Sequence, residues 1–357
     1  MKALVLLSGG LDSTLAIKLM LEQGIEVEAL NFSTIFCQCT SKRSSCGSEA
    51  KRVSETFGIP IKVINHSEVF LEIVKRPRYG YGSQMNPCID CRILMFKTAA
   101  DYMKQSGASF LVTGEVLGQR PMSQHLRALK LIEKETGLEG LILRPLSARV
   151  LEPTIPEKMG WVNREKLSAI KGRSRKEQII LAELFELKDY PCPSGGCLLT
   201  DPSFSRRVKD ILTYSDMTVN EGMLLKYGRH FRLNPQTKLV VGRNELENKI
   251  LLSLVRDGDM IIEIKNCPGP VAILRGNNSD ANIKLAAGIT ARYADLSGED
   301  GNAEVRSRDN ITVLQTIGIA PLTSSEVKKY LISTPDNPPR LGRVDGAGEE
   351  TISCCGN

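Results

Sequence analysis

Ala3-Leu4-Val5-Leu6-Leu7 and the residues that follow it, Ser8-Gly9-Gly10-Leu11-Asp12-Ser13-Thr14, decide how the first half of the chain folds. The apolar run shows no alternation, which is typical of a strand buried on both faces. The two glycines allow a tight turn, and Leu15 and Leu19 then follow at helical spacing. A helix that begins at such a turn gathers unpaired N–H groups around one point, which suits an anion. A plain turn with a capping serine is the alternative, but the Gly-Gly pair, the flanking hydroxyls and Asp12 favour a phosphate site.

This phosphate loop is not a Walker loop, because no Gly-Lys-Ser/Thr follows its first glycine at the required spacing. Ser8–Ser13 resembles instead the Ser-Gly-Gly-Xaa-Asp-Ser signature of the PP-loop ATP pyrophosphatases. Enzymes of that superfamily adenylate a carbonyl-type oxygen, release pyrophosphate and let a nucleophile displace AMP. The resemblance implies ATP as a cofactor. Asp12 would hold the phosphates through Mg²⁺, because a bare carboxylate repels phosphate.

The composition is that of an ordinary globular protein. The chain has 357 residues, 41% hydrophobic and 25% charged, which predicts two domains, or three, with a packed core. No apolar stretch approaches the ~20 residues that span a bilayer, and no signal segment precedes the first strand. A cytoplasmic location is therefore expected. In that reducing compartment the ten cysteines are metal ligands or redox-active thiols rather than structural disulfides.

Strand-like and helical stretches alternate along the first part of the chain. This pattern predicts an α/β fold over residues 1–202, a doubly wound and mostly parallel sheet. Asn31, at the end of the second strand, would then lie on the ligand side. Residues 203–334 contain short strand-like runs separated by turn residues, which predicts a smaller α+β domain. Residues 335–357, rich in Pro, Gly, Asp and Glu, are predicted to form a flexible tail.

A further nucleotide-facing segment follows the strand predicted at 110–113. Its pattern, Thr113-Gly114-Glu115 followed by Gly118-Gln119, resembles the 4-thiouridine synthases, in which this strand end faces the nucleotide. The ATP-binding residues so predicted are Ser8, Gly9, Gly10, Asp12, Ser13, Asn31, Gly114 and Gln119.

Two cysteine segments point to sulfur chemistry. Asn86-Pro87-Cys88-Ile89-Asp90-Cys91 leads into a predicted helix, and a CxxC there points two sulfurs the same way. The helix N-terminus and Arg92 should both stabilise the thiolate form. The segment resembles that of the tRNA 2-thiouridylases. Ser194–Leu198 resembles the segment with their second functional cysteine, so Cys197 inherits that role and Cys192 is an alternative.

Three uses of these thiols are open. In the first, Cys88, Cys91 and Cys197 hold a [4Fe–4S] cluster whose fourth iron binds hydrosulfide, the pattern of the iron–sulfur-dependent tRNA thiolases. In the second, one thiol carries a persulfide and another resolves it by forming a disulfide. In the third, the same cysteines hold a structural zinc. The number of ligands favours the cluster.

Another cysteine group precedes the CxxC. Cys37, Cys39 and Cys46 lie in a polar loop, and their spacing is too loose to be a CxxC. A structural zinc completed by a remote ligand, reactive loop thiols and cysteines without a role are the alternatives.

Basic segments point to RNA, with solvated loops as the alternative reading. Residues 75–82 combine basic side chains with stackable tyrosines, and residues 171–176 form a basic run. Val241-Gly242-Arg243-Asn244 and residues 267–271 resemble the RNA-binding domain of the NFACT family. The predicted RNA contacts are Arg76, Arg78, Arg173, Arg175, Lys176 and Arg243.

Together these patterns predict an ATP-dependent sulfurtransferase that thiolates a uridine in tRNA, with Asp12, Cys88, Cys91 and Cys197 as catalytic residues. A cysteine desulfurase or inorganic sulfide would supply the sulfur, no membrane partner is expected, and a homodimer is left open. One alternative is another adenylating reaction, such as amidation of a metabolite or thiolation of a carrier. The other is a non-catalytic RNA-binding factor that only senses nucleotide.

Overall fold

The computed structural model describes residues 1–37, 46–187, 190, 197–296, 301–308 and 313–332. The chain divides into two compact units, of which the first begins at Met1 and ends at Leu198, and the second begins at Leu199. Among the described residues no helix is long and apolar enough to cross a membrane.

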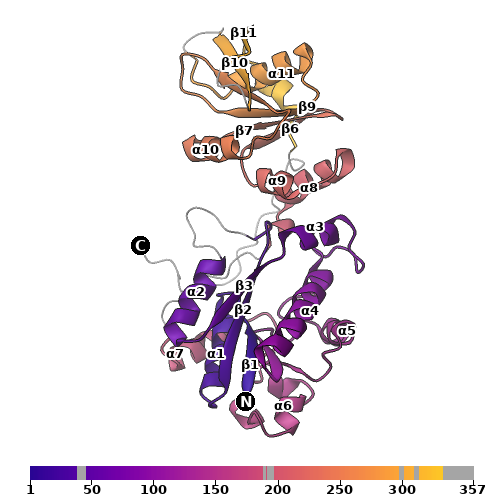
Figure 1. Cartoon of the computed structure of the whole chain (residues 1–357), viewed down its shortest axis with the longest axis vertical. Coiled ribbons are helices and arrows are strands. Elements are labelled where there is room, and N and C mark those ends of the chain that lie inside the picture. Colours follow the sequence, from indigo (N-terminus) through magenta and orange to yellow (C-terminus); the bar gives the residue numbers. More distant parts are fainter. Residues whose placement is uncertain (38–45, 188–189, 191–196, 297–300, 309–312, 333–357) are drawn as a thin grey trace, which may run out of the picture. The chain divides into compact units, whose positions relative to one another are not determined.

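The first unit is built on a five-stranded parallel sheet in the order β3-β2-β1-β4-β5 (Figure 1). This confirms the predicted α/β class. Because all strands are parallel, the loops that follow them lie at one edge of the sheet. The chain that follows β1 and the chain that follows β4 turn to opposite faces of the sheet at this edge. The strands are β1 (Lys2–Leu6), β2 (Glu26–Ser33), β3 (Ile61–Asn65), β4 (Phe110–Thr113) and β5 (Ile142–Leu143).

Helices cover both faces of this sheet (Figure 1). One face packs against α1 (Leu11–Leu21), α2 (Cys46–Phe57) and α7 (Lys176–Leu184), and the other packs against α4 (Cys88–Ser106) and α5 (Leu126–Thr136). In β1, Val5 belongs to the first core and Leu4 to the second, and both are fully buried. This is why the strand reads as a continuous apolar run. The remaining helices are α3 (Ser67–Lys75) and the short α6 (Ile155–Lys158).

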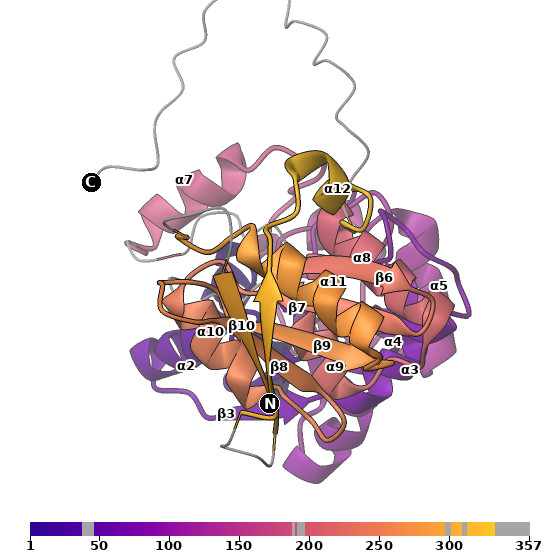
Figure 2. The ribbon, with the colours of Figure 1, turned by 90° about the horizontal axis from the view of Figure 1, so that it is seen from above.

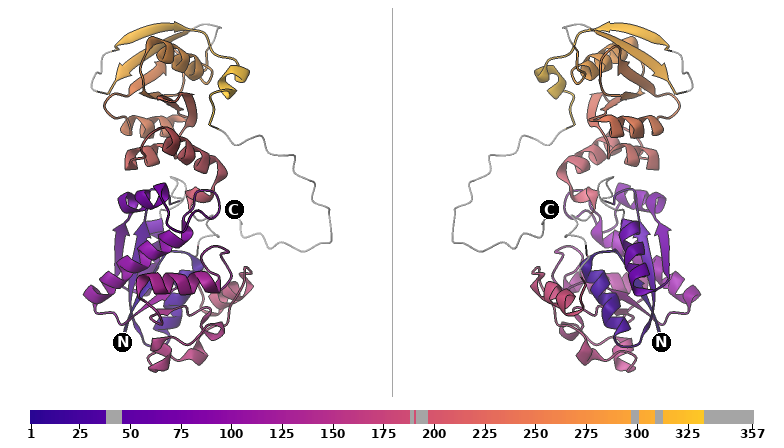
Figure 3. Two further views of the ribbon diagram at one scale, coloured as in Figure 1. Left: turned by 90° about the vertical axis from the view of Figure 1, so that its right-hand side faces the viewer. Right: turned by 90° about the vertical axis from the view of Figure 1, so that its left-hand side faces the viewer.

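The second unit contains a six-stranded antiparallel sheet in the order β11-β10-β8-β9-β7-β6. As predicted, it is an α+β unit. Helix α11 (Asp280–Ala291) packs on one face of the sheet, and α9 (Val219–Leu224) and α10 (Glu245–Ser253) pack on the other (Figures 1 and 2). Figure 3 shows α11 from the side, against the strands in yellow and orange. The strands are β6 (Arg229–Asn234), β7 (Thr237–Val241), β8 (Met260–Ile264), β9 (Ala272–Gly276), β10 (Gly301–Ser307) and β11 (Gln315–Ile319), and the other helices are α8 (Pro202–Tyr214) and α12 (Ser324–Lys328).

Candidate active site

The predicted phosphate loop lies between β1 and α1, and its own hydroxyls hold its shape. Ser13 Oγ donates to the Gly10 carbonyl over 2.9 Å and accepts from the Ser8 N–H over 3.3 Å. Gly9 has φ +78°, and a Cβ there would lie 2.7 Å from Glu49 Cβ in α2. Only glycine therefore suits this position, both for its backbone and for the space around it.

The two carboxylate oxygens of Asp12 have different surroundings. Its Oδ2 accepts a hydrogen bond of 3.1 Å from Gln119 Nε2, whereas its Oδ1 is buried without a hydrogen-bond partner among the described residues. Burial raises the pKa of Asp12, and the Gln119 hydrogen bond and the charges of Arg175 and Arg120 act in the opposite direction. A buried carboxylate oxygen without a partner beside a phosphate loop suits a hard cation such as Mg²⁺.

Gly114 and Asn31 support the loop from the neighbouring strands. A Cβ on Gly114 would lie 2.5 Å from both the carbonyl carbon of Asp12 and the nitrogen of Ser13, so the exit of β4 touches the loop backbone. Asn31 is 1% exposed, and its Nδ2 donates to the Leu7 carbonyl over 2.7 Å. The structure thus gathers the predicted nucleotide residues, with Asn31 fastening the end of β1.

Cys88 and Cys91 occupy the first turn of α4, as the CxxC motif predicts. Burial raises the pKa of Cys88, with Arg92 and Arg120 opposing it. Burial also raises the pKa of Cys91 to about 11; Arg92 opposes this shift, and the nearby Cys88 and Cys37 add to it. Arg92 therefore favours the thiolate form of both cysteines, as predicted, but desolvation outweighs its effect.

Arg120 joins the phosphate loop to the thiols, and sequence reasoning missed it. Its guanidinium lies near enough to lower the pKa of both Asp12 and Cys88, although burial raises both pKa values overall. Desolvation and Arg92 lower the pKa of Arg120, and Cys88 and Asp12 act in the opposite direction. By surface area the residue is still exposed, so its charge can meet a ligand. In the sequence, only its position directly after Gln119 could have pointed to a place near the phosphate loop.

Behind the thiols lies a buried charge network. Glu115, whose side chain is 2% exposed, accepts from Arg144 Nε over 3.1 Å and pairs with Arg92 Nε at 3.4 Å. Arg144 also bonds Glu133 over 2.5 Å. The network ties the helix that carries the CxxC to the ends of β4 and β5.

Cys197 lies opposite Cys37. The two residues form an isolated antiparallel bridge, and the Cys197 thiol donates to the Phe36 carbonyl over 3.6 Å. Within the described part of the chain, no three Cys, His, Asp or Glu side chains are arranged to hold a metal ion. Cys192 and Cys39 lie outside the described residues.

The predicted RNA-binding residues occupy separate places. Arg78 pairs with Glu135 at 2.7 Å, and the backbone N–H groups of Arg78 and Tyr79 each donate to Asp90 over 3.0 Å, which anchors this basic loop on the CxxC. Arg175 lies near enough to Asp12 for its charge to lower the pKa of that carboxyl group. Arg76, Arg173 and Lys176 are exposed in the first unit, and Arg243 is exposed in the second, where it pairs with Glu247.

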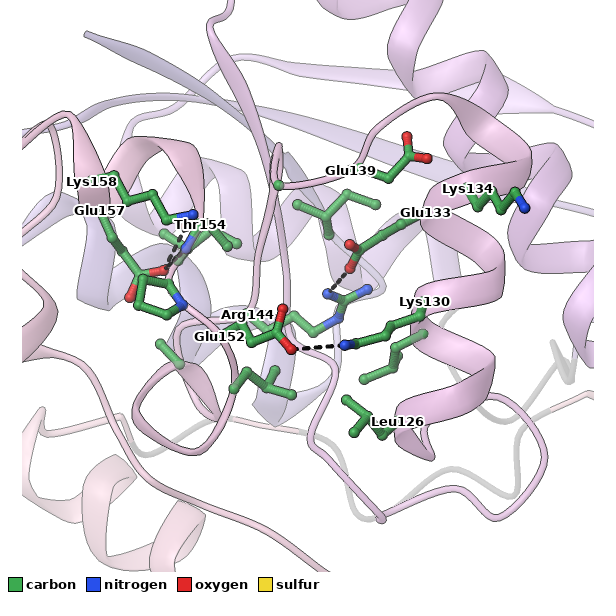
Figure 4. Close-up of a pocket in the computed structure, with 17 residues that line it drawn as sticks. Leu126, Lys130, Glu133, Lys134, Glu139, Arg144, Glu152, Thr154, Glu157 and Lys158 are labelled. Atoms are coloured by element: carbon green, nitrogen blue, oxygen red, sulfur yellow. Dashed lines mark hydrogen bonds and ion pairs between the residues drawn. The ribbon is translucent and has the colours of Figure 1, made fainter.

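A cavity of about 450 Å³ lies elsewhere in the first unit, between α5, β5 and residues 148–158 (Figure 4). Four of its charged groups form two pairs: Lys130 bonds Glu152 over 2.7 Å, and Arg144 bonds Glu133. Neither the phosphate loop nor a cysteine lines it. The loop and the thiols, not this cavity, are therefore the candidate active site.

The parallel sheet, the Ser-Gly-Gly-Leu-Asp-Ser loop and the strand end that touches it define a PP-loop ATP pyrophosphatase domain. Residues 1–150 match the family described as thiamine biosynthesis protein (ThiI), and residues 228–331 match the NFACT protein RNA binding domain. The chain therefore joins a ThiI-type PP-loop domain to a C-terminal NFACT-type RNA-binding domain.

Curated relatives match between about a third and two thirds of the chain at modest identity. It is 28% identical over 251 residues to the tRNA-specific 2-thiouridylase MnmA of Thermotoga petrophila, which is 65% of this chain and 66% of the relative. It is 32% identical over 127 residues to the same protein of Pseudothermotoga lettingae, 32% of this chain and 36% of the relative. The chain thus spans less than two thirds of the length of these relatives.

Among solved structures, the chain is similar to a 4-thiouridine synthetase in complex with RNA and bound ATP. The identity is 21%, the match covers 62% of this chain and 53% of the other, and the TM-score is 0.35.

Proposed function

We propose that this protein is an ATP-dependent tRNA sulfurtransferase, which adenylates a uridine carbonyl oxygen and replaces it with sulfur. One arrangement supports the proposal: Gln119 hydrogen-bonds Asp12 of the phosphate loop, and the adjacent Arg120 lies near enough to Asp12 and to Cys88 of the CxxC for its charge to lower the pKa of each. The group that would handle ATP and the group that would handle sulfur are therefore parts of one site.

Activation is the task of the phosphate loop. A uracil oxygen is a poor leaving group, and transfer of AMP to it makes it a good one. The N–H groups at the start of α1 would bind phosphate oxygens, and Arg175 and Arg120 would offset their negative charge. This assigns Arg175 to ATP and not to RNA. Asp12, whose Oδ1 is buried without a hydrogen-bond partner among the described residues, would hold Mg²⁺, which would supply positive charge to the phosphates.

The acceptor is proposed to be tRNA. The RNA-binding domain supports an RNA substrate, and the relatives named above are tRNA-specific thiouridylases. In the first unit, the loop with Arg76 and Arg78 is fastened to the CxxC through Asp90, so a strand bound there would lie beside the thiols. Arg173, Lys176 and Arg243 would contribute phosphate contacts.

For the sulfur, the sequence favours a [4Fe–4S] cluster on Cys88, Cys91 and Cys197. Three thiols are the right kind of donor for it. In the described residues, however, these side chains do not form a three-ligand group, and no step is derived through a cluster. The close approach of Cys37 to Cys197 favours the second route, in which a persulfide carries the sulfur. Anaerobic purification separates the two: brown, iron-containing protein that Cys91→Ala bleaches supports the cluster, and a colourless, active protein excludes it.

Nucleoside mass spectrometry tests the function itself. A deletion strain should lose one thiolated uridine from its tRNA, and the wild-type gene, but not the Asp12→Asn variant, should restore it. If every thiolated base persists in the deletion strain, the proposal is wrong. Pyrophosphate release that depends on a small metabolite, with tRNA having no effect, would support the alternative adenylating reaction.

A further inference from the structure

Cys37 and Cys197 form a pair that the sequence motifs do not reveal. Cys37 lies four residues beyond the end of β2, at the edge of the sheet where the phosphate loop also lies. Cys197 lies 160 positions later in the sequence and opposes it in an antiparallel bridge. The Leu198 N–H donates to the Phe36 carbonyl over 2.9 Å, immediately beside the pair.

That flanking hydrogen bond identifies the geometry of the pair. In an antiparallel ladder, two opposite residues can be joined by their own backbone hydrogen bonds or flanked by the hydrogen bonds of adjacent residues. The flanked kind is the non-hydrogen-bonded pair, with Cα atoms about 4.5 Å apart and side chains on the same face. Disulfides need Cα separations of about 4.4–6.8 Å. The backbone therefore already holds Cys37 and Cys197 at a distance that a disulfide can bridge.

The surroundings of Cys37 suit a reacting thiol. Its Sγ accepts from the Thr34 N–H over 3.4 Å and lies 3.7 Å from Thr34 Oγ1, so two polar groups face the sulfur. It also lies near enough to Cys91 for its charge to be felt there. Cys37 is thus next to both of the segments proposed to handle sulfur.

We propose that Cys37 is the resolving thiol for Cys197, an inference that rests on the proposed function. Cys197, loaded by a sulfane-sulfur donor, adds the terminal sulfur of its persulfide to the adenylated carbon, and AMP leaves with the electron pair of the C–O bond. The Cys37 thiolate then attacks Cys197 Sγ. The Cys37–Cys197 bond forms, and the bond from Sγ to the transferred sulfur breaks. That sulfur keeps the electron pair and stays on the base. An external dithiol reduces the disulfide to two thiols for the next cycle.

A single-turnover reaction tests this assignment. The full chain is loaded with polysulfide, freed of excess reagent, and mixed with ATP, Mg²⁺ and unmodified tRNA without reductant. Wild-type protein should yield thionucleoside together with an equal amount of Cys37–Cys197 disulfide in peptide maps. Cys37→Ser should leave the RNA bound to Cys197 through a disulfide, and thionucleoside should appear only after dithiothreitol is added.

The controls separate this inference from the proposed function. Cys267→Ser, in the second unit, should behave as wild type. Cys37→Ala should behave as Cys37→Ser does. Melting temperatures equal to that of wild type show that both variants are folded. Thionucleoside released by Cys37→Ser at the wild-type yield without reductant, or a disulfide that maps to Cys91 and Cys197, overturns the role of Cys37 alone. Wild-type protein that releases tRNA-dependent pyrophosphate but transfers no sulfur from polysulfide also overturns it and leaves adenylation standing. Absence of tRNA-dependent pyrophosphate release overturns the proposed function as well.

Discussion

Gln119 Nε2 donates to Asp12 Oδ2 over 3.1 Å, and this bond joins the loop that follows β4 to the first turn of α1. The donor fixes one carboxylate oxygen and leaves Oδ1 buried and without a hydrogen-bond partner in the described structure. An oxygen held in this way is pre-organised for a cation, because its orientation is set before the ion arrives.

The first prediction concerns this carboxylate. Asp12→Asn keeps an oxygen that can accept from Gln119 but removes the charge that holds Mg²⁺, so tRNA-dependent pyrophosphate release should fall by about 100-fold or more. Gln119→Ala keeps the charge of Asp12 and removes only the hydrogen bond that orients its carboxylate, so the rate of pyrophosphate release should fall by about tenfold. The matched control is Asp257→Asn, on an exposed carboxylate of the second unit. An Asp12→Asn variant as fast as wild type would contradict the assignment.

The second prediction compares two glycines of the same site. Gly114→Ala places a Cβ 2.5 Å from the backbone of Asp12, so the loop must move, which should cost about 1–3 kcal/mol of unfolding free energy and most of the ATP affinity. Gly10 has an ordinary φ of −86°, and its Cβ would meet only Ser8 Oγ at 3.5 Å. Gly10→Ala should therefore preserve stability and lose ATP affinity, because the new methyl fills space that a phosphate needs. Urea unfolding measures the stability of each variant, and calorimetric titration measures its affinity for ATP. If Gly10→Ala and Gly114→Ala lose the same unfolding free energy, this explanation is wrong.

Local patterns predicted the secondary structure around the candidate site well where its parts are close in sequence. The apolar run, the glycines and Asp12 follow one another, and the CxxC begins the helix that its position suggests, so periodicity and turn chemistry were enough. Contacts between distant segments could not be predicted in this way. The Cys37–Cys197 pairing depends on how a loop and a late segment meet, and the position of Arg120 depends on the sheet order. The effect of Arg92 on the thiols could be predicted from its position in the sequence, whereas the burial that dominates the pKa of Cys91 could not, because burial is a tertiary property.

The third prediction concerns the buried ion pair behind the thiols. Glu115→Ala leaves Arg144, whose side chain is 4% exposed, without its most buried partner. The free energy of unfolding should therefore fall by about 3–5 kcal/mol. The double variant Glu115→Ala/Arg144→Met should recover part of that loss, because the most buried charge is removed and the charges that lose a partner, Glu133 and Arg92, are closer to solvent. The control pair lies on the rim of the cavity in Figure 4: Glu152→Ala removes an exposed partner of Lys130 and should cost less than about 1 kcal/mol. Similar losses for Glu115→Ala and Glu152→Ala would refute this account.

The last prediction is a pH dependence in the second unit. Lys238 is 3% exposed, and its Nζ lies 3.9 Å from Asp210 Oδ2 without a hydrogen-bond partner in the described structure. Burial lowers its pKa to about 7, against the pull of Asp210. Between pH 7 and the ordinary value of about 10.5, the unfolded chain therefore holds a proton that the folded chain has released. Raising the pH through this window favours the folded state, by at most about 1.4 kcal/mol per pH unit.

Lys238→Met replaces the titrating amine with a neutral side chain of similar volume, while Asp210 keeps its 2.6 Å pair with Arg232. Thermal melts of the full chain between pH 6 and pH 9 should show wild-type stability rising relative to the variant above pH 7, with a constant difference below it. Lys284→Met, on an exposed position of α11, is the control and should track wild type at every pH. If the difference between wild type and Lys238→Met is the same at pH 6 and pH 9, then Lys238 stays charged in the folded state, and Asp210 outweighs burial.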